Sequence, residues 1–377
     1  MTARPVIGVV GLGRMGLGIA ETFAAAGFAV LATDAHQPTR DAALNRLADA
    51  LAKRVAAGKL APAVRDATVE NFMVTPDLSG LHPAGLVVEA IVENLAAKQD
   101  LFAALERVIA PAAVLATNTS SLCVADIAKG LMHPARVLGL HFFNPAPVMR
   151  LVELVPHQGT AETAMTLARD VTEAAGKTVV QAPDSPGFIV NRCARPYYGE
   201  ALAMLEEGRS AAVIDAAMQA AGYPLGPFAL IDLIGADVNL AATEGLSAAM
   251  GGHPRYHVFD ALRTAVAAGQ LGRKSGQGFV YPAPVDAIPA PADASDIVLR
   301  IEATLINEAG FLLYDTGLAP QDIDTALMLG LNFPRGPFAA LSAAGKPRIL
   351  QVLASLQAAA PPALKSRYYP APLLRLP

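Results

Sequence analysis

A chain of 377 residues is long enough for two or three domains, and its formal net charge of -4 excludes the broad basic surface of a nucleic-acid-binding protein. No run of 18 apolar residues is free of Gly, Pro and charge, so we expect no transmembrane helix and no membrane partner. The two cysteines, Cys123 and Cys193, have neither a disulfide pattern nor metal-ligand spacing, which predicts a cytoplasmic protein without a metal site.

The first segment predicts a dinucleotide-binding turn. Residues 5–10, PVIGVV, form a short apolar run typical of a buried strand, and a GxGxxG pattern of Gly11, Gly13 and Gly16 follows. A helical pattern comes next. Gly11 allows a tight turn, Gly13 lets the backbone approach a pyrophosphate, and Gly16 lets the helix pack on the strand.

Asp34 completes this pattern at the end of a second apolar run over residues 29–33, 21 residues after Gly13. An acid at this spacing is expected to bind the ribose hydroxyls and to repel a 2′-phosphate, which favours NAD over NADP. Arg40 lies close by, but the acid makes it a poor phosphate clamp. A nucleotide-free, flavodoxin-like turn is the alternative interpretation.

Six more apolar runs predict strands, and helical patterns separate most of them. Such alternation predicts a mainly parallel, doubly wound sheet. The runs cover residues 72–75, 86–92, 113–119, 138–143, 151–155 and 178–182.

Residues 37–71 are too long for a single crossover helix and predict a helical excursion. The excursion carries Lys53, Arg54, Lys59 and Arg65. These side chains form either a solvated helix face or a platform for a substrate phosphate.

Polar residues gather where the predicted strands end. Ligands bind at the carboxyl ends of the strands in a sheet of this kind, so we expect these residues to line one site. They are Glu93 with Asn94, the segment 118–121, His141 with Asn144, and Glu153.

His141 and Glu153 belong to two apolar runs, VLGLHF and LVELVP, that a turn containing Pro and Asn can bring together. A carboxylate facing an imidazole orients the ring and stabilises its protonated form, as a general base requires. The alternative is a satisfied ion pair within the core.

The character of the chain changes after residue 183, where β-runs give way to long Ala- and Leu-rich helices. We expect an NAD-binding domain at 1–183, a helical domain at 184–284, a Pro/Ala linker at 285–294 and a second, degenerate helical copy at 295–377. The predicted fold class is an α/β Rossmann-like N-terminal domain followed by two all-α helical domains.

The second copy is inferred from a weak repeat. Glu200 matches Glu308, Asp215 matches Asp324, and the segment 226–228 matches 336–338. The same alignment places Asn191, an ordinary polar helix residue on spacing alone, opposite Leu299. The second copy is therefore expected to pack rather than to react.

Together these motifs resemble the 3-hydroxyacyl-CoA dehydrogenase family from residue 7 to about 281. The matching segments are GLGRMGLGIA, VVEAIVEN, NTSSL, GLHFFNP, LVELV, DSPGFIVNR, GYPLGPF and GRKSGQGFVY. GLHFFNP and PGFIVNR are highly specific, whereas the Gly-rich turn is not. The resemblance implies NAD-dependent, reversible oxidation of an L-3-hydroxyacyl-CoA, such as 3-hydroxybutyryl-CoA, to the 3-ketoacyl-CoA.

The resemblance also implies the site residues. The catalytic residues fall on Ser120, His141, Glu153 and Asn191, and the NAD contacts on Gly11, Gly13, Gly16, Asp34, Glu93, Lys98, Ser120 and Asn144. His141 would take the hydroxyl proton while Glu153 holds its ring. Ser120 and Asn191 would position the substrate.

The match is incomplete at the acyl-CoA substrate. Two positions that contact CoA in the family fall on Ala50 and Ala57 here, and we expect the neighbouring Lys53 and Arg54 to bind the substrate instead. The extra copy resembles the duplicated domain of multifunctional β-oxidation enzymes, in which it replaces a dimer partner. This resemblance implies a monomer.

Two alternative functions remain open. One is oxidation of a free hydroxy acid, as in the related gulonate dehydrogenases, although HFFNP favours the CoA branch. The other is an NAD-binding protein that has lost catalysis, as a lens crystallin can. The intact set of four catalytic residues argues against it.

Overall fold

The structure, a computed structural model, describes residues 4–283 and 288–375 and divides into two units, Met1–Phe188 and Ile189–Pro377. The predicted boundary at residue 183 lies a few residues before this division. The first residues of the predicted linker at 285–294 lie outside the described residues.

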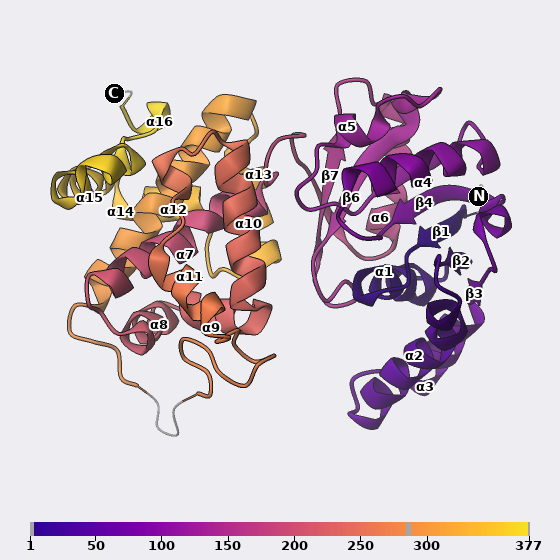
Figure 1. The fold of residues 1–377 in the computed structure, drawn as a ribbon, viewed down its shortest axis with the longest axis horizontal. Coiled ribbons are helices and arrows are strands. Elements are labelled where there is room, and N and C mark those ends of the chain that lie inside the picture. The colour runs from indigo at the N-terminus through magenta and orange to yellow at the C-terminus, as the bar shows by residue number, and fades with distance from the viewer. Residues whose placement is uncertain (1–3, 284–287, 376–377) are drawn as a thin grey trace. The chain divides into compact units, whose positions relative to one another are not determined.

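The first unit is built on one sheet. Within the described residues its strands are β1 (Val6–Val10), β2 (Val30–Thr33), β3 (Phe72–Val74), β4 (Ala84–Glu89), β5 (Val114–Thr117), β6 (Val137–Phe142), β7 (Leu151–Pro156) and β8 (Thr178–Gln181). Their order is β3-β2-β1-β4-β5-β6-β7-β8 (Figure 1). The strands β1 to β6 are parallel to one another, whereas β7 is antiparallel to β6 and β8 is parallel to β7.

Every predicted strand is present, but one is displaced. The run at 86–92 was expected to remain extended to its end, whereas β4 begins at Ala84 and stops at Glu89. The Glu89 carboxylate accepts a hydrogen bond of 2.7 Å from the N–H of Ile91, which turns the chain away from the sheet.

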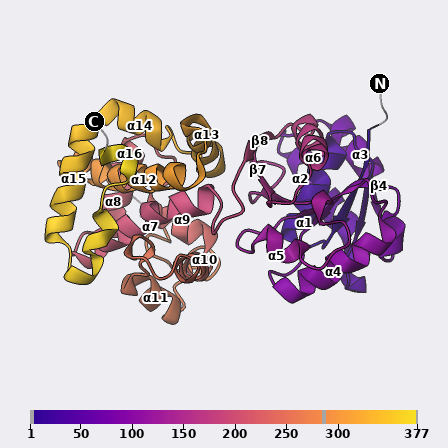
Figure 2. The same cartoon turned by 90° about the horizontal axis from the view of Figure 1, so that it is seen from above.

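Helices cover both faces of this sheet (Figure 2). The helices are α1 (Arg14–Ala25), α2 (Gln37–Ala56), α3 (Pro62–Glu70), α4 (Leu95–Val108), α5 (Val124–Ala128) and α6 (Glu162–Ala174), with 3-10 turns at η1 (Leu78–Leu81) and η2 (Pro134–Arg136). Helices α1, α2 and α6 share one apolar core with the sheet, to which β6 contributes Leu138, Leu140 and Phe142. Because side chains alternate along a strand, His141 projects from the opposite face.

The second unit is helical and repeats one arrangement. The first copy consists of α7 (Val190–Glu206), α8 (Ala211–Ala220), α9 (Pro227–Ile234), α10 (Ala236–Ala249), η3 (Pro254–Tyr256) and α11 (Asp260–Ala267). The second consists of α12 (Ala294–Thr316), α13 (Pro320–Leu331), α14 (Pro337–Ala344), α15 (Lys346–Ala359), η4 (Pro362–Tyr368) and α16 (Pro372–Arg375). The longest helices of the two copies, α7 and α12, pack against each other (Figure 1).

An aspartate caps the third helix of each copy. Asp215 accepts hydrogen bonds of 2.9 and 2.7 Å from the N–H groups of Phe228 and Ala229. Asp324 accepts bonds of 2.8 and 3.0 Å at the start of α14. These bonds satisfy donors that a helix leaves open at its first turn.

Two buried glutamates join the copies. Glu308 of the second copy accepts hydrogen bonds from the first, and Glu200 of the first accepts them from the second. The donors are Arg192, Arg255 and Tyr256 for Glu308, and Arg300, Arg367 and Tyr368 for Glu200. Each glutamate thus accepts from two arginines and one tyrosine at equivalent positions of the other copy. The contact between the copies has the two-fold pattern of a symmetric dimer interface, but it lies within one chain.

No helix of the described segments combines the length and the apolar character needed to cross a bilayer.

Candidate active site

The Gly-rich turn has the shape that a dinucleotide needs. Gly11 has φ +93°, in the region that favours glycine, and a Cβ at Gly16 would lie 1.7 Å from the Gly11 carbonyl oxygen. A Cβ at Gly13 would meet no atom within 4 Å, so this position opens to the outside. Gly13 begins α1 without a side-chain cap, which leaves the first turn of the helix as an anion site.

Asp34 is held beside this turn at the end of β2. Its carboxylate accepts hydrogen bonds from the N–H groups of Leu12 at 2.7 Å and His36 at 2.9 Å. Arg40 donates to the carbonyl oxygens of Asp34 and Ala35. The turn, the helix end and the acid therefore fit a dinucleotide whose ribose reaches Asp34.

Glu93 organises the loop that carries Ser120. It accepts hydrogen bonds from the Thr119 hydroxyl at 2.6 Å, the Ser120 N–H at 3.1 Å and the Ser121 hydroxyl at 2.9 Å. Burial disfavours its charge, but the bonds from Thr119 and Ser121 and the charge of Lys98 hold the pKa of Glu93 below its ordinary value. Glu93 is therefore a charged anchor for this loop.

Lys98 lies beneath the same loop and is almost fully buried. Its Nζ lies 2.6 Å from Glu89 and 3.3 Å from Glu93. Glu89 also accepts a hydrogen bond of 2.7 Å from Thr117 on β5. Glu89 thus connects Lys98 to the end of β5, and the contact of Lys98 with NAD stays a prediction.

His141 and Glu153 face each other across β6 and β7. The strand register pairs them directly, and His141 Nδ1 lies 2.6 Å from Glu153 Oε2. Both side chains are buried, at 6% and 0% exposure. Glu153 was expected at the carboxyl end of a strand. It lies near the start of β7 instead, and the antiparallel direction of β7 brings it to the same edge.

Two aromatic rings restrict the imidazole. The ring centroids of Phe143 and Phe188 lie 4.5 and 5.7 Å from that of His141. Phe188 has φ +48°, which is a strained conformation for an aromatic residue. The preceding turn is anchored by Asp184, whose carboxylate accepts hydrogen bonds of 2.8 and 2.9 Å at the start of α5.

Lys177 fixes the loop between β6 and β7, which carries Asn144. Its Nζ donates hydrogen bonds to the carbonyl oxygens of Ala146 at 2.5 Å and Met149 at 2.8 Å. Burial lowers the pKa of Lys177 to about 8, although Glu21 opposes this effect.

The basic residues of the helical excursion fall into two groups. Arg54 forms an ion pair with the largely buried Glu21, and Arg65 pairs with Asp66. Lys53 and Lys59 are exposed, and within the described residues neither forms an ion pair. Lys53 therefore offers an available positive charge, whereas that of Arg54 is partly neutralised.

The four residues predicted to be catalytic belong to both units. His141 and Glu153 are in contact in the first unit, and the Asn118 side chain, which accepts from the Phe142 N–H at 2.8 Å, ties the Ser120 loop to β6. Asn191 lies in the first turn of α7 in the second unit. No group of three His, Cys, Asp or Glu side chains in the described part of the chain is arranged to hold a metal ion.

Sequence reasoning missed three supports of this site: Glu89, Asp184 and Lys177. Asp184 belongs to the matching segment DSPGFIVNR, but the sequence predicts no role for it. An acid at the end of a strand, such as Glu89, was the one local signal available, because the partners of Asp184 and Lys177 are distant in the sequence.

Family models match nearly the whole chain. The NAD binding domain of 3-hydroxyacyl-CoA dehydrogenase matches residues 6–185. The C-terminal domain of the same family matches residues 187–281 and again residues 297–375. The second match covers the helical copy inferred from the repeat.

Individual relatives agree with the family models. The 3-hydroxyadipyl-CoA dehydrogenase of Escherichia coli is 34% identical over 98% of this chain and 96% of its own length. The 3-hydroxybutyryl-CoA dehydrogenase of Mycobacterium tuberculosis is 40% identical over 72% of this chain and 96% of its own. A crystal structure of 3-hydroxybutyryl-CoA dehydrogenase from Escherichia coli superposes with a TM-score of 0.92 at 33% identity, over 99% of this chain and 98% of that one.

Proposed function

Because the chain belongs to the 3-hydroxyacyl-CoA dehydrogenase family, we propose that it oxidises the C3 hydroxyl of an L-3-hydroxyacyl-CoA to a ketone and catalyses the reverse reduction. The observation that carries the proposal is the hydrogen bond of 2.6 Å between His141 and Glu153. NAD, when bound, supplies the acceptor for the C3 hydride. The side chains of the protein remove and return the proton of the C3 hydroxyl.

In this proposal His141 is the general base. The carboxylate of Glu153 can only accept a hydrogen bond, so Nδ1 of His141 carries the hydrogen and Nε2 presents a lone pair. Nε2 takes the proton of the C3 hydroxyl, and Glu153 stabilises the imidazolium that forms. In the reverse direction the imidazolium returns this proton to the C3 oxygen.

In this proposal Ser120 and Asn191 position the substrate. Hydrogen bonds from these side chains fix the C3 hydroxyl and the thioester relative to His141. Lys53 binds a phosphate of CoA, with a smaller contribution from Arg54 because Glu21 partly neutralises its charge.

We propose that the protein is a monomer, as expected from its second copy. The support comes from Glu200 and Glu308, which receive equivalent donors from opposite copies. This arrangement already buries within one chain the face that a two-fold dimer would use. Light scattering should give the mass of one chain, and a tight dimer through the first helical copy would contradict it. A cytoplasmic location stays a prediction.

A substrate panel tests the proposed function. Purified protein with NAD should produce NADH from L-3-hydroxybutyryl-CoA, and not from its D isomer or from free gulonate. Activity with gulonate alone would favour the free-acid alternative. NADH binding without turnover of any substrate would favour the non-catalytic alternative.

A further inference from the structure

One buried place in the helical unit differs in character between the two copies. In the second copy it belongs to an apolar core, whereas in the first copy the side chains that fill it carry polar groups. The aligned pairs are Arg195 with Ala303, Tyr198 with Ile306, Asn239 with Ile349 and Thr243 with Leu353. Because apolar side chains fill the place in the second copy, this arrangement of helices does not require polar ones.

Arg195 is the one cation of this set and is 7% exposed. Among the residues that the structure describes, none of the ion pairs includes Arg195. Burial lowers the pKa of its guanidinium, and Tyr198, whose ring centroid lies 4.9 Å from the guanidinium carbon, opposes this effect. A buried charge without a counter-charge lowers the stability of a protein. Arg195 therefore imposes a cost that Ala303 of the second copy avoids.

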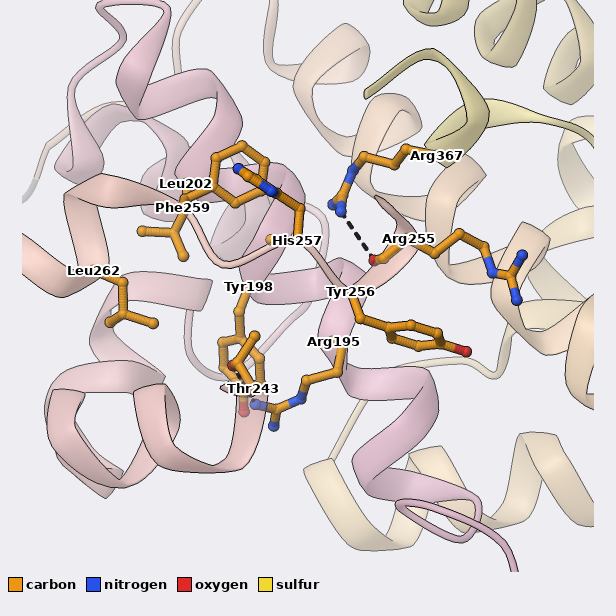
Figure 3. Close-up of a pocket in the computed structure, with 11 residues that line it drawn as sticks. Arg195, Tyr198, Leu202, Thr243, Arg255, Tyr256, His257, Phe259, Leu262 and Arg367 are labelled. Atoms are coloured by element: carbon orange, nitrogen blue, oxygen red, sulfur yellow. Dashed lines mark hydrogen bonds between the residues drawn. The ribbon is translucent and has the colours of Figure 1, made fainter. Parts of the chain in front are cut away.

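The guanidinium of Arg195 connects the first turn of α7 to helix α10. Its Nε donates a hydrogen bond of 3.1 Å to the carbonyl oxygen of Asn191, four residues earlier. Its Nη1 donates to the Thr243 hydroxyl at 2.9 Å and, more weakly, to the carbonyl oxygen of Asn239 at 3.4 Å. Figure 3 shows the guanidinium next to Thr243 and Tyr198. Side chains on a helix lean toward its N-terminus, which lets Arg195 reach back to the turn that carries Asn191.

The cavity beside Arg195 is too small for a ligand. Its volume is about 10 Å³, which is room for one water molecule and not for a group of a substrate. Arg255 and Arg367 also border this cavity, but both form ion pairs with buried glutamates. The role of Arg195 therefore lies in the two helices that it connects.

A proline weakens the first turn of α7. Pro196 lies inside this helix and has no N–H, so it cannot donate to the carbonyl oxygen of Arg192, and a proline ring crowds the carbonyl four residues before it. The aligned residue of the second copy is Thr304, which has an N–H. The first turn of α7 is therefore held less firmly by its own helix than the first turn of α12. The hydrogen bonds of Arg195 supply a second attachment for this turn.

We infer that Arg195 is a positioning residue of the dehydrogenase reaction: it holds the first turn of α7 against α10 and thereby fixes the place of Asn191. This inference rests on the proposed function, in which Asn191 positions the substrate. A displacement of a positioning group by about 1 Å can cost about 100-fold in rate, even when the mutated residue lies away from the chemistry. Hydrogen bonds from a charged donor are stronger than neutral ones, so the guanidinium holds this turn firmly.

A double-mutant cycle with L-3-hydroxybutyryl-CoA and NAD tests the inference. R195M keeps most of the side-chain volume but removes every donor. It should lower kcat about 10-fold and leave the KM for NAD within about 2-fold. The melting temperature should not fall, because an apolar side chain replaces an unpaired buried charge. R195K, which retains a charged donor, should recover part of the activity. In the N191L protein, R195M should change kcat by less than about 2-fold, because the group to be positioned is absent.

The matched control is I349A in the second copy. It truncates the residue aligned with Asn239 and should lower the melting temperature, while kcat stays within about 2-fold of the wild-type value. Two results would overturn the inference: a kcat of R195M within about 2-fold of the wild-type value, or equal losses from R195M in the wild-type and N191L proteins. Wild-type activity decides the proposed function separately. An active wild-type protein with an unaffected R195M refutes the inference alone, whereas an inactive wild-type protein refutes both.

Discussion

The two helical copies share an arrangement of helices and structural residues, but they differ in several buried side chains. Both have an aspartate at the third helix, a buried glutamate in the longest helix and a glycine before the fourth, at Gly235 and Gly345. Only the first has Asn191 and Arg195, where the second has Leu299 and Ala303. Polar residues present in both copies are therefore structural, and those confined to the first are candidates for function.

The loop at 272–281 follows the same rule. It is anchored by Asp232, which accepts hydrogen bonds of 2.9, 2.8 and 2.9 Å from the N–H groups of Phe279, Val280 and Tyr281. The second copy has Ser342 at the position aligned with Asp232. The anchoring aspartate is therefore a specific feature of the first copy.

The largest expected effect comes from the shared glutamates. E308Q leaves Arg255 without an ion-pair partner among the described residues and Arg192 with Asp315 alone, and it should lower the free energy of unfolding by about 3–5 kcal/mol. E200Q should have a comparable effect through Arg367. Urea denaturation measures both. If the free energy of unfolding of either variant fell by less than about 1 kcal/mol, the two glutamates would not have equivalent structural roles.

Exchanging the unshared residue should affect activity instead. N191L introduces the residue of the second copy and should lower kcat about 100-fold, because it removes a positioning hydrogen bond. L299N, the reverse exchange, should leave kcat unchanged. Steady-state kinetics with L-3-hydroxybutyryl-CoA, supported by melting temperatures, gives the answer. Similar losses of activity in both variants would refute the assignment of the site to the first copy.

The capping aspartates should differ in their response to pH. Burial raises the pKa of Asp215 to about 7 against its two backbone hydrogen bonds, whereas Asp324 is less buried. The folded form therefore binds more protons than the unfolded form between pH 4 and 7. Stability should fall as the pH rises through this window, by up to about 1 kcal/mol per pH unit.

The control for this slope is D215N. Its free energy of unfolding should change less between pH 4 and 7 than that of the wild-type protein, and D324N should alter the slope less than D215N does. Parallel curves for the wild type and D215N would show that Asp215 titrates normally.

The smallest effect on stability should come from the residues with positive φ that follow helices α8 and α13. Gly222 in the first copy and Asn332 in the second have φ +94° and +55°. G222A should cost about 1 kcal/mol, because alanine is strained in this region, and N332G should change stability by less than about 0.5 kcal/mol. Thermal unfolding measures both. If G222A did not change the stability, the turn after α8 would have to adopt a backbone conformation that alanine tolerates.

Much of the first unit was predictable because its signals are local. Apolar runs and intervening helical patterns predicted each strand, and two such runs suggested the contact between His141 and Glu153. The reversed direction of β7 was not predicted, since an apolar run carries no information about direction. Glu89 and Lys177 were also missed, because a buried charge depends on partners far along the chain.

The repeat shows a similar limit in the second unit. Its alignment identified Glu200 and Glu308 as equivalent, but not that each binds the arginines of the other copy. Arg195 was overlooked because an arginine in a helix has no sequence signature of burial. Only the packed core reveals that no acid among the described residues forms an ion pair with it.

The central claim is that His141 is the base of a dehydrogenase, and H141Q tests it most directly. With L-3-hydroxybutyryl-CoA and NAD, kcat should fall at least about 100-fold, while NADH affinity measured by calorimetry stays within about 3-fold. An unchanged kcat in a folded, NADH-binding H141Q protein would contradict the account.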